Sequence, residues 1–210
     1  MKGEERAVIR SLPSGVPGLD IVLGGGFPEY SFNLITGGPG SGKTTLAHQI
    51  MFANATVERP ALYFTVLGEP TLKMLRYQRQ FSFFDPDLAG SAIQFINLSA
   101  EVMERDLGEV LQRIVTEIER AKPGIVVVDS FRTIAGQHRS SERGATFDLD
   151  KFVQRLALHL TTWEVTSFLL GEYVEEEQRN PVFTVGDGIL WLSQAIDRNS
   201  VVRKLQVMKT

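Results

Sequence analysis

Residues 35–45 read Ile35-Thr36-Gly37-Gly38-Pro39-Gly40-Ser41-Gly42-Lys43-Thr44-Thr45. From Gly37 to Thr44 this stretch follows the pattern G-x-x-x-x-G-K-[ST] of a nucleotide-binding P-loop. Residues 31–35 before it have the composition of a strand, and residues 46–53 after it predict a helix. The pattern is informative in such a strand–loop–helix context. It therefore predicts a phosphate-binding loop inside an α/β fold.

The predicted chemistry of this loop comes from its backbone and from two side chains. Glycines let successive N–H groups converge on phosphate oxygens at a helix N-terminus, where unpaired donors and the helix dipole favour anions. The Lys43 ammonium can reach the β- and γ-phosphates, and the Thr44 hydroxyl can ligate Mg²⁺. We therefore predict ATP and Mg²⁺ as cofactors. The predicted cofactor-binding residues are Gly38, Pro39, Gly40, Ser41, Gly42, Lys43, Thr44 and Thr45.

The composition predicts one soluble domain over residues 1–210, because 43% of the residues are hydrophobic and 22% are charged. The net charge of −3 provides no general attraction to nucleic acid or to an anionic membrane. The chain has no cysteine, which excludes disulfides and thiolate zinc sites and is typical of a reducing cytoplasm. Residues 1–12 are charged and do not resemble a signal peptide, and no apolar stretch approaches the ~18 residues of a membrane helix. We expect a cytoplasmic protein.

Strands and helices are predicted to alternate after the P-loop, which implies right-handed crossovers and a mostly parallel central sheet flanked by helices. A turn-rich segment, residues 12–28, is expected to wrap against the domain. Residues 189–192 and 201–208 predict a C-terminal antiparallel hairpin. The other predicted strands are residues 61–66, 92–96, 125–128 and 166–170. The predicted helices are residues 72–81, 107–118 and 149–160.

Two carboxylates follow predicted strands at the edge where α/β sheets bind ligands. Asp129 follows residues 125–128 and is predicted to hold Mg²⁺ directly or through water, supported by Ser130; the alternative is an Asp that caps the next segment. Glu69 follows residues 61–66, a strand that we expect beside the P-loop strand. Its carboxylate is a candidate base for the attacking water, and the alternative is a solvated residue that opens a helix.

Loops at the same edge bear on binding partners. Residues 171–180 are strongly acidic, which repels phosphate backbones, so we predict no nucleic-acid partner.

The three histidines lack metal-ligand spacing and are expected on helix surfaces or in loops, and the two tryptophans are expected to pack in the core. These residues are His48, His138, His159, Trp163 and Trp191.

The glycine-rich entry to the P-loop resembles that of a known family. Ser14-Gly15-Val16-Pro17-Gly18-Leu19-Asp20, then Leu23-Gly24-Gly25-Gly26-Phe27-Pro28 and the P-loop, are similar to the entry signature of KaiC-like ATPases in the RecA/RadA superfamily. Val126-Val127-Val128-Asp129-Ser130 resembles their Walker B strand, and the resemblance covers essentially the whole chain. It implies a RecA-type fold and a homo-oligomeric ring, hexameric in that family, with ATP between subunits. It also implies slow hydrolysis that switches a signalling or timing assembly, with Glu69 as the catalytic glutamate.

The sequence departs from the family pattern at three places. Gly68-Glu69 stands where family members often carry two glutamates, and residues 182–187 keep only Thr184 of the adjacent Ser and Thr acceptors of kinase-active domains. Autokinase activity is therefore the weaker option. Family hairpins continue into a Lys-x-Arg-Gly segment whose cations reach the neighbouring γ-phosphate. Lys209 matches the first of these cations and is a candidate catalytic residue in trans, and the ending of the chain suggests one half of a tandem protein.

The predicted function is thus an Mg²⁺-dependent ATPase that acts as a nucleotide-driven switch in a ring, with regulatory protein partners. One alternative is a RadA-type DNA recombination or repair ATPase, against which the acidic residues 172–177 argue. The other is a scaffold in which bound nucleotide is structural and turnover is negligible.

Overall fold

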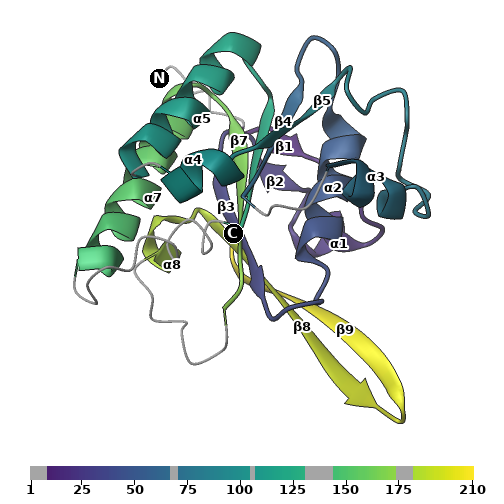
Figure 1. Cartoon of the computed structure of the whole chain (residues 1–210). Coiled ribbons are helices and arrows are strands. Elements are labelled where there is room, and N and C mark those ends of the chain that lie inside the picture. Colours follow the sequence, from purple (N-terminus) through teal and green to yellow (C-terminus); the bar gives the residue numbers. More distant parts are fainter. Residues whose placement is uncertain (1–8, 67–70, 105–106, 131–143, 174–181) are drawn as a thin grey trace, which may run out of the picture.

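The computed structural model describes residues 9–66, 71–104, 107–130, 144–173 and 182–210. Within them, seven strands form a central sheet in the order β5-β4-β6-β7-β3-β8-β9 (Figure 1). Neighbouring strands are parallel except β8 and β9, which form an antiparallel hairpin. This arrangement confirms the predicted fold class and the predicted hairpin. The strands are β3 Phe32–Gly37, β4 Ala61–Thr65, β5 Ile93–Asn97, β6 Ile125–Asp129, β7 Thr166–Gly171, β8 Gly188–Asp197 and β9 Ser200–Lys209.

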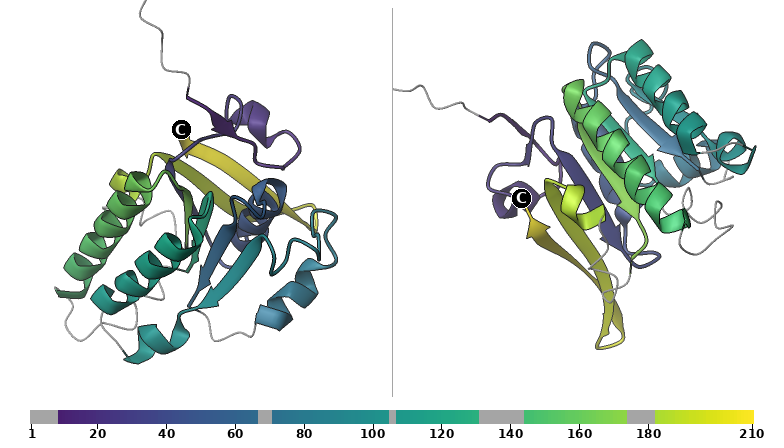
Figure 2. Two further views of the ribbon diagram at one scale, coloured as in Figure 1. Left: turned by 90° about the horizontal axis from the view of Figure 1, so that it is seen from above. Right: turned by 90° about the vertical axis from the view of Figure 1, so that its left-hand side faces the viewer.

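Helices cover both faces of the sheet (Figures 1 and 2). Successive strand residues point to opposite faces, so that Leu34 packs with α5 and α7 while Ile35 packs with α2. This two-sided burial is why the strands read as continuous apolar runs. Among the described helices, none has the length and apolar composition to cross a bilayer. The helices are α1 Leu19–Val22, α2 Lys43–Asn54, α3 Thr71–Gln78, α4 Ser99–Glu104, α5 Leu107–Ala121, α7 Gly144–Thr162 and α8 Val182–Val185.

The expected position of one strand is wrong. The sequence predicts that the strand of residues 61–66, observed as β4, lies beside the P-loop strand, but β6 and β7 both lie between β4 and β3. Parallel strands are joined by long crossovers, and these allow consecutive strands to occupy distant places in the sheet. An apolar run that is buried on both faces carries no information about its neighbours.

The segment before the P-loop contains short elements that the turn-rich sequence does not predict. Strands β1 Ser11–Leu12 and β2 Phe27–Pro28 pair antiparallel, and α1 lies between them. Leu19 and Phe27 are buried in the same cluster as α2, so the segment does wrap against the domain. Gly26 has φ 122°, and a Cβ there would lie 2.4 Å from the Leu12 carbonyl oxygen. Only glycine fits this crossing of two chain segments.

Helix α2 is tied to this entry segment by its polar side chains. The Gln49 amide donates to the Gly15 carbonyl at 2.7 Å, and the Asn54 amide donates to the Pro13 carbonyl at 2.8 Å. The Asp20 carboxylate accepts the backbone N–H of Ser14 at 2.8 Å. The entry segment therefore acts as a strap that holds the helix following the P-loop.

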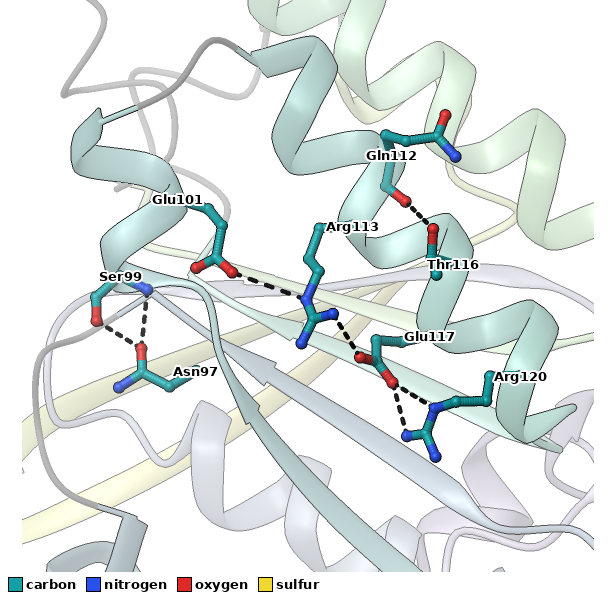
Figure 3. A network of polar contacts seen from close by, with 8 residues as sticks. All are labelled: Asn97, Ser99, Glu101, Gln112, Arg113, Thr116, Glu117 and Arg120. Atoms are coloured by element: carbon teal, nitrogen blue, oxygen red, sulfur yellow. Dashed lines mark hydrogen bonds and ion pairs between the residues drawn. The ribbon is translucent and has the colours of Figure 1, made fainter.

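A polar network on the opposite face joins α4 to α5 (Figure 3). The Asn97 side chain accepts the backbone N–H of Ser99 at 2.8 Å, which satisfies a free donor at the start of α4. Arg113 lies between Glu101 at 3.7 Å and Glu117 at 2.9 Å, so that one guanidinium bridges the two helices. Such exposed pairs contribute little individually. Their effect here is to fix the orientation of α4.

Candidate nucleotide site

The P-loop joins β3 to α2 at the carboxyl edge of the sheet. Gly42 is the N-cap of α2 and has φ 103°, a conformation that favours glycine. The Lys43 ammonium folds back over the loop and donates to the carbonyls of Gly37 at 2.9 Å and Gly38 at 2.8 Å. Its Nζ also lies 3.9 Å from the Glu172 carboxylate. Burial lowers the pKa of Lys43, and the charges of Glu172 and Asp129 oppose that shift.

Asp129 lies directly beneath the start of α2. Its Oδ2 accepts a hydrogen bond from the Thr44 hydroxyl at 2.7 Å and another from the Tyr63 hydroxyl. Burial raises the pKa of Asp129, while the hydrogen bonds from Tyr63 and Thr44 and the charge of Lys43 lower it and the charge of Glu172 raises it further. The structure thus brings together both residues that the sequence predicts for Mg²⁺.

A cavity of about 700 Å³ opens beside the P-loop, within the range of small-molecule sites. Residues 40–45 form one wall, and Asp129, Ser130 and Glu172 border it at the strand ends. Ser130 lines the cavity next to Asp129. The predicted support of Asp129 by Ser130 stays a prediction. The Ser41 hydroxyl is buried and has no hydrogen-bond partner within the described part of the chain. An unsatisfied buried hydroxyl at the N-terminus of α2 is suited to a phosphate oxygen.

Two residues of the hairpin reach the P-loop, and the sequence analysis does not predict them. Strand β8 pairs with β3 only as far as Leu192, so the outer half of the hairpin projects beyond the sheet (Figure 1). There the Gln194 amide donates to the Pro39 carbonyl at 2.8 Å. Arg203 is the cross-strand partner of Gln194 and lines the cavity near Gly42. A cation at this position complements a phosphate group.

An aromatic side chain borders the cavity on the side of α2. Phe81 lines it together with Gln49, and its ring stacks on Phe83 with centroids 5.3 Å apart and planes 9° apart. A half-exposed ring held in this way offers a flat surface to a nucleobase. The only sequence signal for this surface is the group of three phenylalanines within residues 81–84.

The oxygen ligands and the loop geometry fit a magnesium–nucleotide complex. Mg²⁺ prefers a few protein oxygens together with water and phosphate, and Thr44 and Asp129 supply such oxygens. No group of three or more acidic or histidine residues suited to a metal occurs among the residues that the structure describes. Thr44 and Asp129 are thus the described side chains that would share such a metal with a phosphate.

Comparison with known proteins gives the family. A family model described as "ATPase: KaiC" matches residues 12–210. The chain belongs to the KaiC family of ATPases. A KaiC-like protein of Pyrococcus horikoshii has the same fold, with a TM-score of 0.80 over 96% of this chain and 89% of that chain at 24% identity.

Two curated relatives of this KaiC-family chain differ in length. A UPF0273 protein of Thermotoga maritima is 26% identical over 71% of this chain and 67% of its own length. The DNA repair protein RadA of Mycobacterium tuberculosis is 30% identical over 80% of this chain. The matched region spans 32% of that RadA protein. These matches confirm the predicted membership of the RecA/RadA superfamily.

Of the two further residues predicted to be catalytic in the KaiC-family site, the structure describes Lys209 and does not describe Glu69. Glu69 and its neighbour Gly68 lie outside the described residues. Lys209 pairs with Ile189 near the beginning of β8, at the edge of the sheet opposite the P-loop. Its ammonium donates to the Gly186 carbonyl at 2.7 Å. The roles of Glu69 as base and of Lys209 in trans stay predictions.

The expected surface position of one histidine is wrong. His48 lies on α2 and is fully buried between the rings of Tyr63 at 4.6 Å and Phe95 at 5.8 Å. The reason is that α2 is covered both by the sheet and by the segment around residues 83–95. His159 is half-buried on α7 and stacks on Trp163, while Trp191 is buried; His138 lies outside the described residues.

Proposed function

We propose that this chain binds Mg²⁺–ATP and hydrolyses it slowly, as a nucleotide-driven switch in a ring with ATP at the subunit interfaces. The observation that carries the proposal is the 2.7 Å contact between the Thr44 hydroxyl and Asp129 at the start of α2. A hydroxyl and a carboxylate at these positions, next to the P-loop lysine, form the metal side of a phosphoryl-transfer site.

The chain's own residues would act as follows. The N–H groups of residues 40–45 bind phosphate oxygens, and Lys43 exchanges its carbonyl partners for the β- and γ-phosphates. Thr44 and Asp129 hold Mg²⁺, which neutralises charge on the phosphates when it is bound. Glu69 orients and deprotonates the attacking water. The ring of Phe81 faces the nucleobase, and Arg203 faces the phosphates.

A role of the subunit interface follows from the resemblance to ring-forming family members. Lys209 lies at the edge of the sheet that is opposite its own P-loop. A contact between Lys209 and a γ-phosphate would therefore be with nucleotide bound by a neighbouring subunit. A signalling or circadian-clock-like role, regulatory protein partners and a hexameric ring belong to the same proposal.

The proposal is tested by steady-state phosphate release at several protein concentrations, with assembly size measured by light scattering. We expect turnover per subunit to rise with assembly. Lys43→Ala should lose nucleotide binding, whereas Glu69→Gln should bind ATP and release phosphate at least about 100-fold more slowly. Wild-type protein that assembles and retains ATP without releasing phosphate would contradict the proposal and support the scaffold.

A RadA-type function is the second candidate, favoured by the 30% identity to the Mycobacterium tuberculosis protein. Its test is binding to single-stranded DNA at 50 and 200 mM salt. A steep loss of affinity with salt would support it, because phosphate contacts release counterions. Glu172 at the end of β7 places a negative charge beside the P-loop, and this charge favours the first candidate.

A further inference from the structure

Tyr63 connects the middle of the sheet to the proposed Mg²⁺ site. It lies on β4, and its side chain is 1% exposed on the face that α2 covers. Its hydroxyl donates to Asp129 Oδ2, the same oxygen that accepts the Thr44 hydroxyl. In the β4–β6 register Tyr63 is paired with Val127, so Asp129 is its diagonal neighbour on the same face. An aromatic side chain spans this diagonal distance.

The ring of Tyr63 packs against aromatic side chains of α2 and β5. The His48 ring from α2 packs against it at 4.6 Å, and the Phe95 ring from β5 packs at 5.6 Å. Gln78 is buried at the end of α3. Within the described residues, its Oε1 and both ring nitrogens of His48 have no hydrogen-bond partner. These groups therefore contribute packing around the ring, while the hydroxyl of Tyr63 is directed to the carboxylate.

The two donors to Asp129 differ in what nucleotide binding would do to them. The Thr44 hydroxyl has to turn from Asp129 to the metal when it becomes a ligand. The Tyr63 hydroxyl lies on a buried ring with few torsions, so its bond to Asp129 can persist. Groups that orient a metal-holding carboxylate in this way commonly change metal affinity about 10-fold or more when they are removed.

We propose that Tyr63 is a positioning residue of the Mg²⁺ site, whose buried hydroxyl keeps the Asp129 carboxylate oriented when Thr44 turns to the metal. This inference rests on the proposed function, because it assumes that Thr44 and Asp129 hold Mg²⁺ with a nucleotide. It adds a residue of β4 that the P-loop and Walker B patterns do not contain.

The test is the Mg²⁺ requirement of nucleotide binding, measured with the fluorescent analogue MANT-ATP on wild-type protein and Tyr63→Phe. The substitution keeps the ring packing and removes the hydroxyl. We expect the Mg²⁺ concentration at half-saturation to rise about 10-fold or more, while affinity for the analogue in EDTA changes less than about 2-fold. Tyr77→Phe, which removes an exposed hydroxyl on α3, should match the wild type.

A double-mutant cycle separates positioning from packing. In an Asp129→Asn background, Tyr63→Phe should have no further effect on the Mg²⁺ requirement. An equal effect in both backgrounds, or a folded Tyr63→Phe protein with the wild-type requirement, would overturn the inference and leave the proposed function intact. Wild-type protein that does not bind MANT-ATP at any Mg²⁺ concentration would overturn both.

A measurement on the wild type covers the case in which Tyr63→Phe does not fold. The buried hydroxyl proton of Tyr63 should exchange slowly with water and give its own downfield NMR resonance. We expect this resonance to shift when Mg²⁺ is added to protein that already holds MANT-ATP, and to persist in the ternary complex. The inference would be overturned if the resonance disappeared in the ternary complex, or if its chemical shift did not change when Mg²⁺ was added.

Discussion

At the scale of single residues, His48 is an ionisable side chain in a place that disfavours its charged form. Burial lowers its pKa from 6.5 to about 4, and the nearby side chain of Gln78 opposes this shift, although neither ring nitrogen of His48 has a hydrogen-bond partner among the described residues. The rings of Tyr63 and Phe95 pack around it. His48 therefore remains neutral in the folded protein over a pH range in which it is protonated in the unfolded chain.

This difference predicts a pH-dependent stability. Below pH 6.5 the unfolded chain binds a proton at His48 that the folded protein does not bind until about pH 4, so stability is lost as the pH falls between these values. Between pH 7.5 and 4.5 we expect His48 to account for a loss of about 2–3 kcal/mol. Urea unfolding of wild type and His48→Leu at both pH values measures it, since other groups titrate alike in the two proteins. Equal losses in the two proteins would contradict the prediction.

At the scale of the elements, the junction of β3, the P-loop and β8 depends on one close approach. Gly37 has φ 142°, and a Cβ there would lie 1.9 Å from the Leu192 carbonyl oxygen of β8. Gly38 is its matched control, because it has no atom within 4 Å of a built Cβ. We expect Gly37→Ala to lower the free energy of unfolding by about 2–4 kcal/mol and Gly38→Ala by less than about 1 kcal/mol. Urea unfolding without nucleotide measures both, and similar losses would show that the approach is not rigid.

Some elements and contacts of the structure can be predicted from the sequence, and others cannot. The helical spacing of apolar residues predicts α5, and a continuous apolar run predicts β6, almost to their observed ends, because α5 buries one face and β6 buries both. The short elements β1, α1 and β2 span too few residues for a period to appear. The contacts of Gln194 and Arg203 with the loop depend on the register of β8 on β3, which joins distant parts of the chain. Tyr63 stands within an apolar strand, and a buried tyrosine hydroxyl usually has a hydrogen-bond partner. The sequence does not identify that partner as Asp129.

At the scale of the whole molecule, several of the exposed apolar side chains lie on the C-terminal hairpin and on α1. Ile196 and Val201 form a cross-strand pair at the tip of the hairpin and are 82% and 60% exposed. On α1, Ile21 and Val22 are 86% and 64% exposed. Two different apolar surfaces on one chain are what a head-to-tail ring requires.

This distribution predicts that the hairpin tip takes part in self-association. Ile196→Asp should lower the mass of the assembly in light scattering at a given concentration, and it should leave the thermal midpoint of the monomer nearly unchanged because the residue is exposed. Val57→Asp changes a 69%-exposed residue in a loop elsewhere and should assemble like the wild type. Normal assembly of Ile196→Asp would place the interface elsewhere.

The order of the strands has a consequence for how the protein is made. The P-loop strand β3 is among the first elements synthesised, yet its two neighbours in the sheet are β7 and β8, which begin at residues 166 and 188. A nascent chain that ends before β7 therefore holds β3 with both edges unpaired. The cavity beside the phosphate loop gains Glu172 and Arg203 only when β7 and β9 have been synthesised, so shorter nascent chains lack part of the site through which bound nucleotide would add stability.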